Sequence, residues 1–256
     1  MRLIRYQTAP DSARFGWIFE DRVGPVEGSI FGEFARAEAS HDLASVRLLP
    51  PVLPGKIVCV GRNYLAHAKE QEVEVPEVPI LFLKPPSALI GPGEAIQLPP
   101  QSQQVEHEAE LAVVIGQRGR WIPPDQALDY VLGYTIGNDV TARDLQRRDG
   151  QWTRSKGFDT FCPLGPWIET EFEIADALIT CHVNGEMRQM ASTRDMVFNV
   201  RQLIAFASSV MTLEPGDVLL TGTPAGVGPL VDGDVVQVAI EGLGNLSNPV
   251  VAEPSH

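Results

Sequence analysis

Apolar residues along this chain fall mainly into short runs that are rich in β-branched side chains and end at glycine or proline. Runs of this kind are typical of β-strands. The pattern predicts strands at Met1–Gln7, Phe15–Phe19, Gly24–Gly28, Lys56–Gly61, Val78–Leu83, Ala95–Leu98, Leu111–Ile115, Val218–Thr221, Val235–Ile240 and Val250–Ala252.

Helical segments are fewer. Leu65–Glu72 consists of residues that favour helix, and Pro124–Val131 has a proline at its start. Met196–Val210 carries apolar residues at helical spacing, and a shorter helical stretch is predicted around Phe31–Ala39. This balance of elements indicates a β-rich α+β protein.

A proline-rich stretch at Leu49–Gly55 separates two parts of the chain. We therefore expect a small N-terminal domain at residues 1–52 and a larger domain at residues 53–256. A chain of 256 residues is long enough to bury a substantial core.

Composition excludes several classes of partner. The net charge of −13 argues against nucleic acid or an anionic membrane, because a phosphate backbone needs a basic surface. No apolar run is long enough to span a membrane, and the first residues lack a signal-peptide core, so we expect a soluble cytoplasmic protein. The 3 cysteines are far apart and lack Cys-x-x-Cys spacing, which indicates buried thiols without disulfides or a thiolate zinc site.

Two glutamates, Glu108 and Glu110, stand at alternate positions just before the apolar run Leu111–Ile115. Residues i and i+2 of a strand share a face, where like charges repel unless a cation lies between them. Together with Asp139 they would offer oxygen ligands to Mg²⁺, Mn²⁺ or Ca²⁺ and leave positions open for water and substrate. His107 would point to the opposite face of the strand. The alternative is that the glutamates lie on a solvated face and Asp139 caps a turn.

A second candidate lies in the charged segment after the strand predicted at Lys56–Gly61. In a helix, His67 and Glu70 are i, i+3 neighbours, so the carboxylate can hold one imidazole nitrogen while the other takes a proton from water. Active-site groups often follow strand ends, which favours a base with its orienting partner. The alternative is a solvated surface pair.

Arg143, Gln146 and Lys156 are candidates for binding an anionic substrate, because a carboxylate-rich metal site binds an anion only when fixed cations line its other side. The glycine-rich segment Thr221–Gly228 offers backbone N–H groups and the Thr223 hydroxyl to a carboxylate. It lacks the lysine of a P-loop, and the chain has no dinucleotide fingerprint. The alternatives are surface ion pairs for the cations and a structural turn for the segment.

Taken together, the segments from Lys56 to about Ala252 resemble the fumarylacetoacetate hydrolase family. The motifs that carry the resemblance follow one another in order along the chain. They are Val60–Tyr64 with His67 and Glu70, Phe82–Pro85, His107–Leu111, Asn138–Gln146, Lys156–Asp159, Gly165–Pro166 and Leu220–Pro224.

The resemblance implies a fold and an assembly. The fold is the mixed β-roll of that family, preceded by a small N-terminal β domain of the kind found on many bacterial members, and the assembly is a homodimer. Larger members carry a further aspartate ligand upstream of the histidine, whereas Arg62–Asn63 has no carboxylate. The chain therefore resembles the smaller, acylpyruvase-type branch, in which water completes the metal's coordination.

The resemblance also implies roles for individual residues. A Mg²⁺ ion, or Mn²⁺ or Ca²⁺, would be held by Glu108, Glu110 and Asp139. The catalytic residues would be His67, Glu70 and Lys156, with the first two as a water-activating pair on a lid that is mobile between Tyr64 and Pro79. The substrate would be bound by Arg62, Tyr64, Arg143, Gln146, Gly222 and Thr223.

Three functions are compatible with these residues. The leading hypothesis is metal-dependent hydrolysis of a C–C bond in a 2,4-dioxo acid such as an acylpyruvate or fumarylpyruvate, in which His67 activates water. The alternative is an isomerase or decarboxylase of related 2-oxo or 2-hydroxymuconate-type dicarboxylic acids, which needs the same enolate but no attacking water. The third is a non-catalytic β-rich binding module with a structural Ca²⁺. For either enzyme the partner is a small 2-oxo acid.

Overall fold

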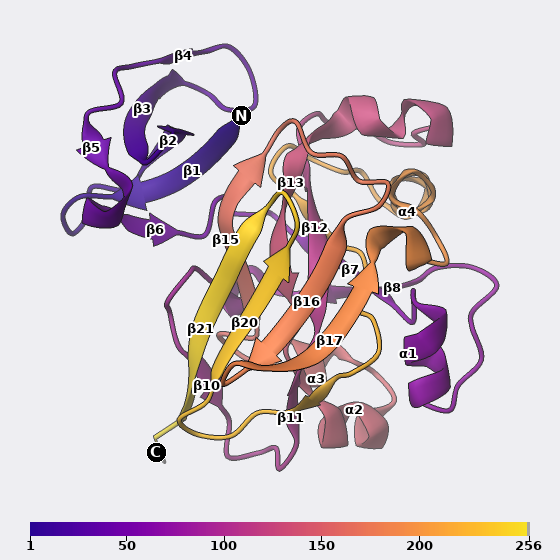
Figure 1. Ribbon diagram of the computed structural model, residues 1–256. Coiled ribbons are helices and arrows are strands. Elements are labelled where there is room, and N and C mark those ends of the chain that lie inside the picture. The colour runs from indigo at the N-terminus through magenta and orange to yellow at the C-terminus, as the bar shows by residue number, and fades with distance from the viewer. Residues whose placement is uncertain (255–256) are drawn as a thin grey trace.

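The computed structural model describes residues 1–254 and is shown as a ribbon in Figure 1. Within these residues the chain forms a 13-stranded sheet, a 5-stranded sheet and a 3-stranded sheet, with a few short helices at their edges. The expected β-rich α+β fold is confirmed. No helix in the described part of the chain is both long and apolar enough to cross a bilayer.

The first strands form an antiparallel meander at one edge of the large sheet, drawn in indigo in Figure 1. Ile4, Tyr6 and Val23 are buried between them. The N-terminal strand pairs with β15 (Cys162–Glu169), where Leu3 lies opposite Ile168, so the meander continues the main sheet. The elements are β1 (Arg2–Gln7), β2 (Arg14–Phe19), β3 (Arg22–Gly28), β4 (Phe34–Arg36), β5 (His41–Asp42), the 3-10 turn Leu43–Ser45 and β6 (Arg47–Leu49).

The prediction of a helix around Phe31–Ala39 is wrong. This segment contains strand β4, which runs antiparallel to β3 with Val26 opposite Arg36. Gly28 has a φ of 103°, a conformation that glycine adopts without strain, and the chain reverses there. The backbone of β4 is therefore paired within the sheet instead of within a helix.

The large sheet has the order β4–β3–β2–β1–β15–β13–β12–β18–β7–β8. β12 is buried at every position, as expected for the apolar run Leu111–Ile115 in the centre of a sheet. The remaining strands of this sheet are β7 (Ile57–Gly61), β8 (Ile80–Lys84), β9 (Leu89–Ile90), β12 (Ala109–Ile115), β13 (Val131–Asn138) and β18 (Val218–Leu220).

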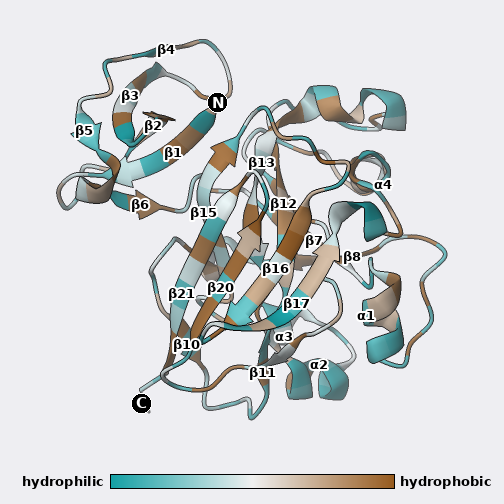
Figure 2. Ribbon diagram, in the orientation of Figure 1, coloured by the Kyte–Doolittle hydropathy of each residue, from teal (hydrophilic) through white to brown (hydrophobic). Residues whose placement is uncertain are grey.

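The second sheet has the order β10–β21–β20–β16–β17, and its apolar residues pack against the large sheet in one core. Figure 2 shows hydrophobic residues recurring along β12, β16 and β20, whereas helix α2 (Arg143–Asp149) is mostly hydrophilic. The strands are β10 (Ile96–Leu98), β16 (Leu178–Val183), β17 (Glu186–Ser192), β20 (Val235–Ile240) and β21 (Gly244–Ala252). The small sheet contains β11 (Val105–His107), β14 (Thr141–Ala142) and β19 (Gly228–Pro229).

Helices occupy the ends of the sheets. The prediction at Leu65–Glu72 corresponds to α1, and that at Pro124–Val131 to a 3-10 helix. The predicted helix at Met196–Val210 begins only after Asn199, whose side chain caps the first turn. The helices are α1 (Leu65–Glu70), α2 (Arg143–Asp149), α3 (Thr153–Lys156), α4 (Val200–Val210) and the 3-10 segments Pro86–Ala88, Pro124–Tyr130 and Thr193–Asp195.

Strand register brings the candidate residues to one edge of the large sheet. β12 begins with Ala109 opposite Asn138, the last residue of β13. Leu220, at the end of β18, pairs with Ala112 of β12 and with Cys59 of β7. The start of β12 therefore lies beside the ends of β13, β18 and β7, where the chain continues into the segments that carry the predicted site.

Candidate active site

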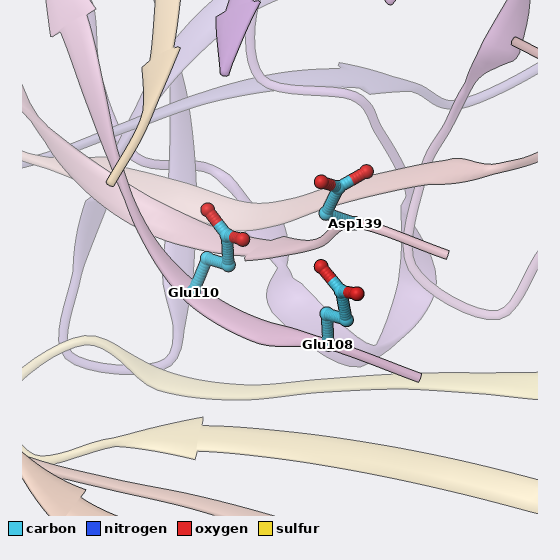
Figure 3. Close-up of side chains that lie close together, drawn as sticks. All are labelled: Glu108, Glu110 and Asp139. Carbon is cyan, nitrogen blue, oxygen red and sulfur yellow. The ribbon is translucent and has the colours of Figure 1, made fainter. Parts of the chain in front are cut away.

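The carboxylates of Glu108, Glu110 and Asp139 come together at this edge. One oxygen from each lies within 4.8 Å of the others, and the three side chains lie close together in Figure 3. Glu108 and Asp139 flank the β12–β13 pairing and are joined by the Asp139 N–H donating to the Glu108 carbonyl at 2.9 Å. The exposed fractions of Glu108, Glu110 and Asp139 are 4%, 1% and 1%, so the alternative of a solvated strand face does not hold.

Three buried cations contact this cluster. The Lys156 ammonium bridges Glu108 Oε2 at 2.8 Å and Asp139 Oδ2 at 2.7 Å. Lys84 donates to the other oxygen of Asp139, and Arg143 donates to Glu108. Lys156 was predicted to face the substrate, and in the structure it also holds two of the predicted metal ligands in place.

Negative charge nevertheless exceeds positive charge in the cluster. Counting Glu106, whose Oε2 accepts from Arg143 Nε at 2.7 Å, four buried carboxylates face three buried cations. Among the described residues, the hydrogen bond made to Glu110 comes from the Gly222 N–H at 2.7 Å. The excess charge therefore centres on Glu110.

The pKa shifts follow this charge distribution. Burial raises the pKa of Glu110 well above its usual value, and the neighbouring Asp139 and Glu108 raise it further. Burial alone would raise the pKa of Glu108 too, but Lys156 and Arg143 hold it well below its usual value. Buried oxygen donors with uncompensated negative charge fit a hard divalent cation, so these three residues would hold one.

His67 and Glu70 form the predicted pair on α1. His67 is 6% exposed, and its Nδ1 lies 3.0 Å from Glu70 Oε2. Because an ionised carboxylate only accepts hydrogen bonds, the proton is assigned to Nδ1, and Nε2 remains able to take one. The other oxygen of Glu70 accepts from the Gly226 N–H at 2.8 Å, which joins α1 to the loop after β18.

One cavity of about 300 Å³ contains most of the predicted residues. The three carboxylates and His67 line it together, at the ends of β7, β12 and β13. Its other polar lining residues are Arg62, Gln71, Arg143, Gln146, Arg147, Lys156 and Thr223, and its apolar wall includes Val60, Val73, Phe82 and Trp152.

Two predicted substrate-binding residues lie outside this cavity. Tyr64 is buried in the core and pairs with Met196 through an isolated β-bridge. Gly222 lies behind Glu110, to which its N–H donates. A Cβ at position 222 would come within 2.7 Å of Asn63 Cβ, so glycine is needed for this close approach.

The side chains of Arg143 and Thr223 are held mainly by the protein. Arg143 Nη1 donates to Gln146 Oε1 at 2.6 Å, in addition to its contacts with Glu106 and Glu108. The Thr223 hydroxyl donates to the Ala109 carbonyl at 2.9 Å and accepts from Gln189 Nε2 at 2.8 Å, so it has no proton left to donate to a ligand. A substrate carboxylate would therefore need other donors.

Several site residues were missed by the sequence reasoning. Lys84 belongs to the motif Phe82–Pro85, but nothing in the local pattern shows that its ammonium reaches Asp139. Arg147 and Trp152 line the cavity from the polar segment around α2. Lysine and arginine are usually solvated, so only the fold places these cations against the site.

Models of known protein families match the chain in two parts. Residues 56–251 match the family described as "Fumarylacetoacetate (FAA) hydrolase C-terminal", and residues 1–51 match "Rv2993c-like, N-terminal".

Curated relatives share about half of the aligned residues. The chain is 52% identical over 224 residues to Protein Rv2993c of Mycobacterium tuberculosis, a match that covers 86% of this chain and 84% of that protein. It is 49% identical over 221 residues to Oxaloacetate tautomerase fahd2, mitochondrial, of Xenopus laevis, covering 81% of this chain and 69% of that protein.

Solved structures match nearly the whole chain. The 5-carboxymethyl-2-hydroxymuconate delta-isomerase from Mycobacterium smegmatis has a TM-score of 0.93 at 48% identity, covering 99% of this chain and 100% of that one. Fumarylacetoacetate hydrolase from psychrophilic Exiguobacterium antarcticum has a TM-score of 0.86 at 41% identity, and this match too covers 99% of this chain and 100% of that one. The chain therefore belongs to the fumarylacetoacetate hydrolase family, with a small N-terminal β domain of the Rv2993c-like kind.

Proposed function

We propose that this protein is a divalent-metal-dependent enzyme that interconverts the keto and enol forms of a small 2-oxo dicarboxylic acid. One observation carries the proposal: His67, whose Nδ1 is held by Glu70, and the three-carboxylate cluster line the same cavity of about 300 Å³. Tautomerisation requires one base and stabilisation of one enolate oxygen, and both requirements are met within this cavity.

The proton moves between substrate carbon and His67. A divalent cation bound at Glu108, Glu110 and Asp139 would supply Lewis-acid stabilisation of negative charge on the substrate. His67 Nε2 removes a proton from the carbon next to the 2-oxo group, and Glu70 balances the charge of the resulting imidazolium. The same pair returns a proton to that carbon in the reverse direction.

Lys156 supplies a further donor. An ammonium group has three N–H donors, and two of those on Lys156 are directed to Glu108 and Asp139. Because Lys156 also lines the cavity, its third N–H is available for the substrate oxygen that becomes the enol. It would neutralise charge on that oxygen and exchange a proton with it.

Two arginines support a second carboxylate on the substrate. Arg62 lines the cavity, and within the described residues no hydrogen bond or ion pair engages its guanidinium. Arg147 lines it too, and the one hydrogen bond of its guanidinium within residues 1–254 goes to Gln104 at 3.3 Å. Guanidinium groups bind carboxylates in a fixed geometry, so these two would select a dicarboxylic over a monocarboxylic acid.

The relatives add independent support for this chemistry. One relative at 49% identity is named an oxaloacetate tautomerase, and one structure at 48% identity is named a hydroxymuconate isomerase. Both names describe rearrangement of a 2-oxo or 2-hydroxy acid that carries at least two carboxylates, without the addition of water.

Hydrolysis of a C–C bond in a 2,4-dioxo acid is the second candidate. It is supported by the related structure named fumarylacetoacetate hydrolase, at 41% identity. In that reaction His67 takes a proton from water instead of carbon, and the water attacks the distal carbonyl. The substrate then divides into a carboxylic acid and the enol of a 2-oxo acid.

A substrate panel separates the two candidates. Purified protein is assayed with Mg²⁺ and with Mn²⁺ on enol oxaloacetate, 2-hydroxymuconate-type dicarboxylates and acylpyruvates, with EDTA as the control. We expect fast metal-dependent conversion of enol oxaloacetate or a muconate analogue. Turnover of acylpyruvates alone would favour hydrolysis, and metal binding without turnover of any of these acids would contradict both.

A further inference from the structure

A buried amide outside the carboxylate cluster joins the start of β12 to the loop after β18. Gln189 of β17 is 1% exposed. Its Oε1 accepts from the Ala109 N–H and from His107 Nδ1, each at 3.0 Å. Its Nε2 donates to Thr223 Oγ1 and to the Pro224 carbonyl, each at 2.8 Å. All four hydrogen-bonding positions of this amide are therefore occupied.

The orientation of the amide is fixed by its backbone partners. The Ala109 N–H can only donate and the Pro224 carbonyl can only accept, so the oxygen must face the first and the nitrogen the second. His107 then carries its proton on Nδ1. Reversing the amide would place two donors together on one side and two acceptors together on the other.

A β-bulge directs this side chain inwards. Gln189 lies opposite Cys181 on β16, but the next pair joins His182 to Met187, which leaves Arg188 as an extra residue. Met187 and Arg188 are consecutively exposed, and Gln189 is buried. Bulges often serve to redirect a side chain next to an active site.

The residues held by Gln189 are neighbours of the site's chemistry. Ala109 lies between Glu108 and Glu110, so its N–H locates the backbone that carries both carboxylates. Thr223 lines the cavity, and its hydroxyl accepts from Gln189 while donating back to the Ala109 carbonyl. The amide thus connects two sides of the site, from a strand that belongs to the other sheet.

We propose that Gln189 is a positioning residue that sets the spacing of Glu108 and Glu110 and the placement of Thr223. This inference rests on the proposed metal-dependent function and adds a residue from outside the cavity to it. Hydrogen bonds behind metal ligands hold the ligands in place, and their loss commonly weakens metal binding ~10- to 100-fold.

The test uses Gln189→Met in the full chain, with Mn²⁺ binding measured by titration calorimetry and unfolding measured by thermal melting. Methionine has nearly the same length and flexibility but makes no comparable hydrogen bonds. We expect ~10-fold or weaker Mn²⁺ affinity. Gln189→Glu keeps an oxygen toward Ala109 and His107 but loses the donors to Thr223 and Pro224, so it should retain Mn²⁺ affinity while KM for the substrate rises.

Asn248→Leu is the matched control. Asn248 is 1% exposed on β21, and its Nδ2 donates to the carbonyls of Gly91 and Glu94 at 2.9 and 2.8 Å. This variant loses a buried amide away from the site. It should lower the melting temperature as Gln189→Met does but leave Mn²⁺ affinity unchanged.

The outcomes separate the two claims. Weakened Mn²⁺ binding in Gln189→Met alone supports the inference, whereas wild-type affinity in that variant overturns it and leaves the metal site intact. Equal weakening in Asn248→Leu also overturns it, because general destabilisation then explains the effect. If wild-type protein binds no Mn²⁺, the metal site itself and the inference both fail. Gln189→Asn, whose shorter side chain cannot reach both segments, replaces Gln189→Met if that variant does not fold.

Discussion

At the scale of single residues, the proposed chemistry depends on the free nitrogen of His67. Glu70 accepts the Nδ1 proton and is itself held by the Gly226 N–H, so the imidazole has a fixed orientation before substrate arrives. A base held in this way loses little entropy when the reaction begins. Among the described residues, no hydrogen bond or ion pair joins His67 to the predicted metal ligands, so its role in proton transfer can be separated from direct metal ligation.

We predict that His67→Ala lowers kcat for tautomerisation by ~10²-fold or more, the effect expected for loss of a general base. Mn²⁺ affinity should not change. Glu70→Gln should lose less activity, because its amide oxygen still accepts from Nδ1 but no longer balances the imidazolium charge. Stopped-flow absorbance of the enol measures the rate. Wild-type kcat in His67→Ala would remove His67 from the reaction.

A second prediction concerns Arg62, whose backbone has a φ of 59°, a conformation that non-glycine residues rarely adopt. A charge-assisted hydrogen bond is worth about 1.5–3 kcal/mol, so Arg62→Gln should lower kcat/KM for dicarboxylic substrates ~10-fold or more. Monocarboxylic 2-oxo acids should be affected little. Arg148→Gln is the control. Arg148 lies on α2 and pairs with Asp149. Equal losses for both substrate classes would contradict the assignment.

Sequence reasoning identified functional residues that stand only two or three positions from a partner residue in the chain. The spacing of Glu108 and Glu110 predicted that their carboxylates converge, and they do, although Glu108 lies just before β12 and only Glu110 within it. His67 and Glu70 share a face of α1 as expected. Gln189 has no such signal, because its partners lie about 80 residues upstream and 34 residues downstream. Only strand pairing across two sheets brings them together.

At the scale of elements, α1 is a single short helix over the cavity. Its inner residues His67 and Ala68 are buried, whereas Leu65 and Lys69 are exposed. Helices this short have little stability of their own, so α1 depends on its contacts, including the bond from Glu70 to the loop at Gly226. The expected lid between Tyr64 and Pro79 stays a prediction.

We predict that Mn²⁺ together with oxalate, a small dicarboxylate that mimics the 2-oxo acid end of the substrate, slows amide exchange in residues 65–72. Contacts between α1 and the bound ligand should make local unfolding of α1 less frequent. Hydrogen–deuterium exchange followed by mass spectrometry measures this, with α4 as an internal reference. Identical protection of residues 65–72 with and without ligand would contradict a lid.

Element prediction succeeded where one pattern persists along the whole element. The continuous apolar run in β12 and the amphipathic spacing of α4 are examples. β17 was missed because the bulge at Arg188 breaks its alternation and leaves Met187 and Met190 exposed. β15 was missed because it contains Pro163 and Pro166, which usually argue against a central strand.

At the scale of the whole molecule, metal binding should contribute to stability. The buried cluster contains one more carboxylate than it has cations, and this imbalance costs free energy until a proton or a cation neutralises it. A ligand that binds only the folded state raises the free energy of unfolding by about 2.7 kcal/mol at ~100 times its Kd.

We therefore predict that saturating Mn²⁺ raises the melting temperature of the wild-type protein. Glu110→Gln removes the excess charge, so this variant without metal should be at least as stable as the wild type. It should also lose the increase caused by Mn²⁺. Differential scanning calorimetry with and without EDTA checks both statements, and an unchanged response to Mn²⁺ in Glu110→Gln would exclude Glu110 as a ligand.

Proton exchange at the substrate carbon tests the proposed function directly. Oxaloacetate is incubated with the protein and Mg²⁺ in D₂O, and deuterium incorporation at the carbon next to the 2-oxo group is followed by NMR. We predict exchange much faster than in buffer, abolished by EDTA and lowered by ~10²-fold or more in His67→Ala. Exchange no faster than with Mg²⁺ alone, or equally fast in His67→Ala, would contradict the claim that this site transfers a proton to and from carbon.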